Sequence, residues 1–226
     1  MLGLVEDVAP RAAQYERQQH DVDAVQLERG AHEVEDVTTH LLQGEWTRTE
    51  VEGIVLVLMT SGRDSVAYLI STAMVALLTH ADQPAALRDD PERIAGAIEE
   101  FLRVGAMFLT LFPRTALVDL ELGGIPIPAG TTVAVSPVAA NRDERRFDDP
   151  DRFDVTREAF GHLGFGHGAH ACIGQQLARL EIREAVTQLL AAAPRLRLVR
   201  AEQQQPMPFA HPVATYEAGA VEVAWR

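Results

Sequence analysis

Cys172 is the only cysteine among the 226 residues of this chain, and it lies in the stretch GFGHGAHACIG (residues 164–174). A single thiol cannot form an internal disulfide, so Cys172 does not crosslink the chain. Four glycines and two histidines accompany it within this stretch. Glycine is used where φ is positive or where another group approaches the backbone closely. The pattern therefore predicts a loop that folds closely against a large, flat group.

Four interpretations of this cysteine can be weighed by the residues around it. A free cysteine is commonly a small buried hydrophobic side chain, but that role leaves the glycines unexplained. A dinucleotide-binding loop needs G-x-G-x-x-G, and Ala169 stands where the third glycine belongs. A zinc site could use His162, His167, His170 and Cys172, although their spacing matches no common zinc pattern. The fourth interpretation is a thiolate ligand to haem iron, with backbone N–H groups directed at the sulfur.

Residues 165–179 read FGHGAHACIGQQLAR. This stretch resembles the cysteine loop of the cytochrome P450 family, F-G-x-G-x-H-x-C-x-G-x-x-L-A-R, and matches it at every specified position. The resemblance implies that Cys172 is the axial thiolate ligand of haem b and that Phe165 packs beside it. It also implies that His170 reaches a haem propionate and that Gly166 belongs to the cofactor-binding loop.

A long apolar run from Ile54 to Leu78 follows Thr47 and Glu50, which form a T-x-x-E capping box. The run predicts one long helix, about long enough to span a bilayer. Arg63 and Asp64 lie near its middle, where each charge would cost roughly 2.5–3.5 kcal/mol in lipid. We therefore expect a helix buried in a protein core and no membrane span.

The middle of this run, TSGRDS (residues 60–65), carries a second motif. Charge inside a buried helix is costly unless it is paired or used, and an Arg63–Asp64 ion pair at a kink is one interpretation. The stretch also resembles the P450 segment [Ala/Gly]-Gly-x-[Asp/Glu]-Thr, which crosses the open face of the haem. That resemblance implies that Asp64 and Ser65 deliver protons to the oxygen, with serine where threonine is usual.

Glu100 and Arg103 form a third motif, E-x-x-R, in a helix expected over residues 91–104. Residues three apart share a helix face, and a surface ion pair would explain the motif by itself. In this order the motif resembles the E-x-x-R of the P450 family. The resemblance implies a buried structural network that Arg152 completes and that holds the cysteine loop. Arg114 falls where the family places an arginine on a haem propionate; a solvated charge at a strand edge is the alternative.

The elements expected to position these residues are mostly helical. Besides the long helix, helices are expected over residues 34–43, 91–104 and 174–193. The pair Gly123-Gly124 is typical of a hairpin turn. Short strands are expected over residues 118–122, 125–128, 131–135, 196–198 and 221–225. Helices separate from short antiparallel strands predict a mostly α, α+β fold. The resemblance specifies it as a truncated cytochrome P450 fold.

We expect two regions: an acidic N-terminal segment over residues 1–32, and the C-terminal haem-binding part of a P450 domain over residues 33–226. Apolar residues make up 47% and charged residues 23% of the chain, as in globular proteins. The net charge of −13 argues against a nucleic-acid partner. The first residues lack the pattern of a signal peptide, so we expect a cytoplasmic protein with no membrane attachment.

The resemblance implies a haem-thiolate monooxygenase that inserts one atom of O2 into a small lipophilic organic substrate. Electrons would come from separate partners, a ferredoxin and a ferredoxin reductase, because no flavin or nicotinamide motif is present. The residues expected to dock an acidic partner are Arg142, Arg145, Arg146, Arg179 and Arg183. The residues expected on the substrate side are Val57, Thr60, Ser61, Phe108, Leu109 and Val213.

The resemblance covers only the C-terminal half of the family's fold, and residues 1–32 do not replace the missing elements. A truncated haem-binding remnant, or one half of a split protein without independent turnover, is therefore the alternative function. A small interaction domain with an ordinary cysteine is a second alternative, against which the combined motifs argue.

Overall fold

The computed structural model describes residues 36–80, 82–110, 112–201, 214–215 and 220–225. Their helices are α2 (Val37–Leu42), α3 (Arg48–Thr79), α4 (Gln83–Asp89), α5 (Ile94–Val104), α6 (Pro137–Ala140) and α7 (Gln175–Ala192), with 3₁₀ turns η1 (Pro91–Arg93) and η2 (Gly168–His170). Their strands are β1 (Phe108–Thr110), β2 (Arg114–Thr115), β3 (Leu120–Leu122), β4 (Ile125–Ile127), β5 (Thr132–Val133), β6 (Arg197–Ala201), β7 (Ala214–Thr215) and β8 (Val221–Ala224). The prediction of a mostly helical α+β fold with small hairpins is confirmed.

Contacts between Cα atoms divide the chain into two units, Met1–Arg63 and Asp64–Arg226, and the division falls inside α3. The first unit contains α2 and the N-terminal part of α3. The second contains the remaining helices and all the described strands. The predicted boundary at residue 32 lies outside the described residues.

The N-terminus of α3 is fixed by the predicted capping box. The Glu50 carboxylate accepts hydrogen bonds from the Thr47 N–H at 2.8 Å and the Thr47 hydroxyl at 2.7 Å. The Glu50 N–H donates to the Thr47 hydroxyl oxygen at 3.3 Å. The bond from the Thr47 side chain, followed by the one from its backbone, lowers the pKa of Glu50. The side chain of each residue therefore accepts a hydrogen bond from the backbone N–H of the other at the start of the helix.

Helix α3 is buried over only part of its length. Its side chains are buried from Tyr68 to Leu77 at helical spacing, but Val57, Leu58 and Met59 are exposed. The most apolar 18-residue window has a mean hydropathy of 1.4, and 22% of that window is buried. Length and composition alone would allow α3 to cross a membrane, and core helices of soluble proteins meet the same criteria. The prediction of a helix buried in a protein core is wrong at these three residues, because apolar composition does not determine what covers a helix.

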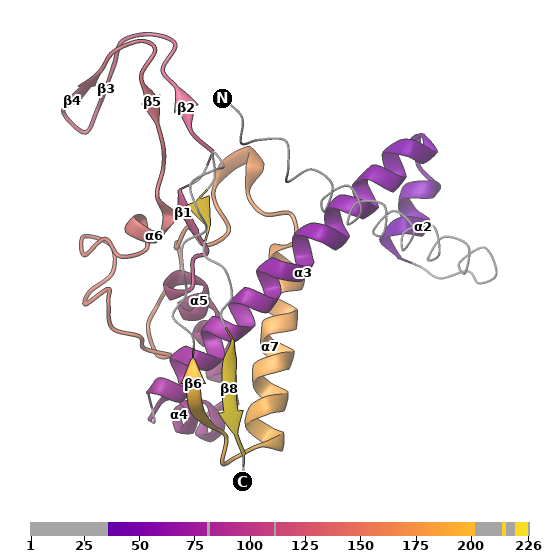
Figure 1. Cartoon of the computed structure of the whole chain (residues 1–226), viewed down its shortest axis with the longest axis vertical. Helices are drawn as coiled ribbons and strands as arrows, with labels where there is room; N and C mark the ends of the chain where they lie inside the picture. Colours follow the sequence, from indigo (N-terminus) through magenta and orange to yellow (C-terminus); the bar gives the residue numbers. More distant parts are fainter. Residues whose placement is uncertain (1–35, 81, 111, 202–213, 216–219, 226) are drawn as a thin grey trace, which may run out of the picture. The chain divides into compact units, whose positions relative to one another are not determined.

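The core of the second unit lies where the C-terminal part of α3 meets α4, α5 and α7 (Figure 1). In α7, Ala178, Ile182, Val186 and Leu190 recur every four residues and form its buried stripe. Other core side chains are Leu69, Ala73, Met74, Leu77, Leu87, Ala97, Ile98, Phe101, Leu102, Phe153 and Val155. This packing holds α5 against α7, the two helices that border the cysteine loop.

Four two-stranded antiparallel sheets complete the described part of the chain. The predicted hairpin is present: Gly123 and Gly124, with φ of 60° and 81°, join β3 to β4. The other sheets pair β2 with β5, β1 with β7, and β6 with β8. The β3–β4 hairpin carries exposed apolar side chains, and the preceding Leu117 is 90% exposed. Helices α4 and α6 and strands β1, β2 and β7 were not predicted from the sequence.

Candidate functional site

Cys172 lies between the 3₁₀ turn η2 and the first turn of α7, with an exposed, unpaired thiol. The Cys172 N–H donates to the Phe165 carbonyl at 2.9 Å, which closes the loop. Gly166 and Gly168 have φ of 72° and 81°, a region that side chains rarely adopt. A Cβ atom added to either glycine would meet nothing within 4 Å. The loop backbone at both glycines therefore borders open space, in which another group could approach closely.

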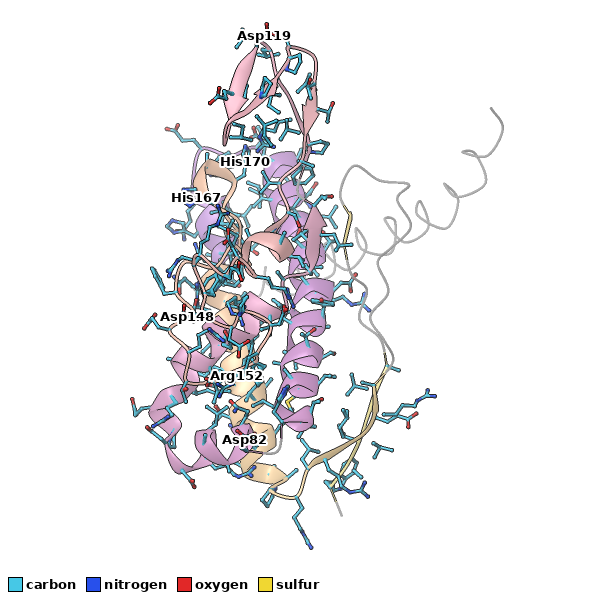
Figure 2. The ribbon with its side chains drawn as sticks, turned by 90° about the vertical axis from the view of Figure 1, so that its left-hand side faces the viewer. Asp82, Asp119, Asp148, Arg152, His167 and His170 are labelled. Carbon is cyan, nitrogen blue, oxygen red and sulfur yellow. The ribbon has the colours of Figure 1, made fainter. Side chains whose placement is uncertain are left out.

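This loop fits a haem-thiolate ligand. The sulfur is accessible, and it precedes the N-terminus of the 18-residue helix α7, where the positive end of the helix dipole stabilises an anion. Figure 2 shows His167 and His170 on the same loop. Among the described residues, no group of three or more His, Cys, Asp or Glu side chains is placed to hold a metal ion. The described residues therefore give no support to the zinc interpretation, whereas a single thiolate ligand would need only Cys172.

The E-x-x-R pair is buried and is not a surface ion pair. The side chains of Glu100 and Arg103 are both 0% exposed, with Nε–Oε2 and Nη2–Oε1 distances of 2.7 and 2.9 Å. Arg103 also donates to the carbonyls of Asn141 at 2.8 Å, Pro150 at 2.7 Å and Arg152 at 3.3 Å. The pair therefore fixes the irregular segment from residue 141 to residue 157 against α5.

Arg157, and not the predicted Arg152, supplies the second cation of this network. The Arg152 side chain is 62% exposed and lies 3.5 Å from Asp154, so only its carbonyl takes part. Arg157 Nε lies 3.3 Å from the Glu100 Oε1 atom, and its Nη2 donates to the Arg152 carbonyl at 3.1 Å. The Asp154 N–H donates to the same Glu100 oxygen at 3.0 Å. The prediction for the Arg152 side chain is wrong because the turn at residues 149–153 directs it to solvent.

Asn141, which was not predicted, joins this network to the cysteine loop. Its side chain is fully buried, and its Nδ2 donates to the Arg103 carbonyl at 3.1 Å. Its Oδ1 accepts from the Leu163 N–H at 2.6 Å, at the start of the cysteine loop. A buried asparagine between two backbone segments is a connection that no local motif in the sequence reveals.

The residues predicted to bind propionates lie on the surface of the second unit. His170 is exposed in η2. Arg114 is exposed in β2, and its Nη1 donates to the Phe112 carbonyl at 2.9 Å. The side chains of His170 and Arg114 are therefore accessible to a ligand, and their role toward a propionate stays a prediction.

The predicted proton-delivery residues lie in the uninterrupted helix α3, where Asp64 is exposed and Ser65 is half-buried. The Thr60 hydroxyl donates to the Leu56 carbonyl at 2.8 Å, within the helix. Of the residues predicted on the substrate side, Val57, Thr60 and Ser61 belong to the first unit, Phe108 and Leu109 are half-buried in β1, and Val213 lies outside the described residues. Their common role stays a prediction.

The arginines predicted to dock a partner are already engaged within the chain. Arg145 pairs with Asp143, and Arg183 lies 3.4 Å from Glu184. Arg179 forms a two-point contact with Glu99, at 2.7 Å from Nε and 3.1 Å from Nη2. Arg142 and Arg146 donate to the carbonyls of Val104 and Phe160. These contacts give Arg179 a structural role that its sequence motif did not reveal.

Comparison with known proteins identifies the family to which this sequence is similar. Residues 6–211 match the family model described as Cytochrome P450. Cytochrome P450 105C1 of a Streptomyces species is 44% identical over 179 residues, which cover 79% of this chain and 46% of that protein. 6-Deoxyerythronolide B hydroxylase of Saccharopolyspora erythraea is 44% identical over 155 residues, or 69% of this chain and 38% of that protein.

A solved structure gives the same result for the fold. The LnmA cytochrome P450 hydroxylase of Streptomyces atroolivaceus superposes with a TM-score of 0.81 at 35% identity, over 98% of this chain and 58% of that chain. This chain spans less than half the length of the two curated relatives described above. The family match covers most of the sequence, including the cysteine loop and the E-x-x-R helix, and the chain therefore belongs to the cytochrome P450 family.

Proposed function

We propose that this chain is the haem-binding part of a P450 monooxygenase and that Cys172 is the thiolate ligand of the haem iron. The observation that carries the proposal is the accessible thiol at the start of α7, in a loop whose two positive-φ glycines border open space. When bound, the haem supplies the activation of O2, and a thiolate ligand favours cleavage of the O–O bond.

The chain's own residues have three tasks in this proposal. Cys172 would hold the haem iron through its sulfur, from a position just before the N-terminus of α7. His170 and Arg114 present donors to the propionate groups. Asp64, which is exposed on α3, and Ser65, which is half-buried on the same helix, would supply protons on the side where O2 is activated.

The proposed substrate is a small lipophilic organic molecule, because the residues proposed for the substrate side are largely apolar. The relatives' names describe hydroxylases and monooxygenases, which agrees with insertion of one oxygen atom. The proposal includes a ferredoxin and a ferredoxin reductase as electron donors and a cytoplasmic location.

Haem binding without turnover is the second candidate function. Apolar side chains at Val57, Met59, Leu117 and Ile125 are exposed, so the described part of the chain presents apolar surface to solvent. An open site admits water, which diverts electrons from the substrate to side reactions. The ratio of oxygenated product to reductant consumed separates the two candidates.

The test is the absorption spectrum of the purified chain after addition of haem, dithionite and CO. We expect the red-shifted Soret band of a thiolate-ligated haem, and we expect Cys172→Ala to lose that band. His167→Ala is the matched control, because its side chain lies on the same loop but outside the proposed ligand set. A thiolate-type band that persists in Cys172→Ala would refute the assignment.

A further inference from the structure

A second ionic cluster, separate from the Glu100 network, binds the cysteine loop directly. Glu99 of α5 accepts from Arg179 of α7 at 2.7 and 3.1 Å, and from His162 Nε2 at 3.0 Å. The side chains of Glu99, Arg179 and His162 are 17%, 25% and 4% exposed. Three segments that are distant in the sequence therefore meet at one carboxylate.

His162 is held in one tautomer by its two hydrogen bonds. Its Nδ1 lies 2.9 Å from the Gly164 N–H, which can only donate, so Nδ1 is the acceptor. The ring proton then resides on Nε2 and is donated to Glu99. The imidazole thus connects α5 to the backbone at the beginning of the loop.

Arg179 connects the same carboxylate to Phe165. Its guanidinium carbon lies 4.7 Å from the centroid of the Phe165 ring, within range of a cation–π contact. The His162 ring lies 6.2 Å from the same ring. The Phe165 carbonyl accepts the Cys172 N–H at 2.9 Å. One continuous set of contacts therefore runs from Glu99 to the backbone of the cysteine.

The loop has no free space to move toward α5. A Cβ atom on Gly164 would lie 2.6 Å from the Leu102 carbonyl oxygen, so the loop backbone is packed directly on the helix. Burial raises the pKa of Glu99, but the hydrogen bonds from His162 and Arg179 and the charge of Arg179 outweigh it and lower the pKa to about 2. The carboxylate is therefore an anion throughout the neutral range.

We propose that Glu99, His162 and Arg179 are positioning residues that set the place of Phe165 and, through it, the direction of the Cys172 thiolate. This inference rests on the proposed function, in which Cys172 is the haem ligand. Contacts to the groups that orient a metal ligand commonly change metal affinity by about 10–100-fold when they are removed. The Glu100 network stabilises the segment before the loop, whereas the Glu99 cluster acts on the ligand-bearing loop itself.

The test uses the single cysteine as a reporter. A chain labelled with ¹⁵N-cysteine gives one backbone amide signal, that of Cys172, whose N–H is bonded to Phe165. We expect Arg179→Ala and Glu99→Gln to speed exchange of this amide in the haem-free chain by about tenfold. We also expect them to weaken haem binding by about tenfold or more. Arg179→Lys, which keeps the charge but not the planar two-point contact, should fall between them and the unaltered chain.

Two controls separate positioning from general stability. Arg183→Ala lies on the same helix but outside the cluster, and it should leave Cys172 amide exchange unchanged. In a second sample labelled with ¹⁵N-phenylalanine, the amide of Phe101 in the core of α5 reports on opening of the whole unit, and its exchange should not change in the cluster variants. If the Phe101 and Cys172 amides speed up equally, or if neither changes, the positioning role is overturned. Failure of the proposed function would be recognised by a different result, because Cys172→Ala would then bind haem as the unaltered chain does.

Discussion

Glu99 and Glu100 are neighbours on α5, yet they stabilise two different regions of the molecule. Successive residues of a helix point about 100° apart, so the two carboxylates face different segments. Glu100 is sealed from solvent with Arg103, it also contacts the partly exposed Arg157, and the network fixes the segment at residues 141–157. Glu99 is partly exposed and contacts the cysteine loop and α7. One turn of one helix therefore organises both the scaffold and the proposed ligand loop.

The difference in burial predicts different energetic roles. A fully buried charge that loses its partner is left without compensation, which makes its removal strongly destabilising. A partly exposed pair contributes less, since solvent screens it. We therefore expect changes in the Glu100 network to act on folding and changes in the Glu99 cluster to act on the loop.

The largest expected effect is that of Glu100→Ala. It leaves Arg103 buried without its carboxylate, and we expect the free energy of unfolding to fall by about 3–5 kcal/mol. Denaturation in urea, followed by circular dichroism, measures the change. The matched control is Arg152→Ala, which removes an exposed side chain and should change stability by less than about 0.5 kcal/mol. Equal effects of the two substitutions would mean that Arg152 completes the network after all.

A smaller effect is expected for Gly164→Ala, where the loop packs on α5. The new methyl group would lie 2.6 Å from the Leu102 carbonyl oxygen, so the backbone must shift. We expect a loss of about 1–3 kcal/mol, together with weaker haem binding. Gly96→Ala, within α5, meets nothing within 4 Å and should stabilise the helix by up to about 1 kcal/mol. If the unfolding midpoints of both variants shifted in the same direction, the close packing of Gly164 on the Leu102 carbonyl would be contradicted.

The smallest effect is the pH dependence that Glu99 contributes. Its pKa of about 2 in the folded chain lies below the ordinary 4.5, so the folded chain binds fewer protons at this group than the unfolded chain does. Its stabilisation is complete above about pH 4.5 and is lost as the pH falls toward about 2. Between about pH 5 and pH 3 we expect a loss of about 1–2 kcal/mol that Glu99→Gln does not show. Parallel pH profiles of the two chains in urea denaturation would show that the cluster does not lower this pKa.

Local patterns in the sequence predicted what depends on local geometry. The capping box at Thr47, the hairpin at Gly123-Gly124 and the helix α7 follow from spacing alone. The positive φ of Gly166 and Gly168 agrees with the glycine pattern around Cys172. Each of these features is determined by residues within a few positions of one another.

Features that depend on the path of the chain could not be predicted in this way. Arg152 and Arg157 are close to each other but far from Glu100 in the sequence, and only the turn between them decides which guanidinium faces the carboxylate. Asn141 bonds to Arg103 and Leu163, which are far from it in the sequence. Strand β7 has only two residues and pairs with β1, which lies far from it in the sequence. The contacts of Glu99 with His162 and Arg179 could not be predicted, because the E-x-x-R motif begins at the next residue, Glu100.

The most direct test of haem-thiolate ligation is the iron–sulfur stretching band in the resonance Raman spectrum of the haem-loaded chain. Because Cys172 is the only cysteine, cysteine that carries a heavy sulfur isotope labels one thiol. We predict a band that moves to lower frequency with the label and is absent in Cys172→Ala. Bound haem whose spectrum contains no label-sensitive band would contradict Cys172 as the iron ligand.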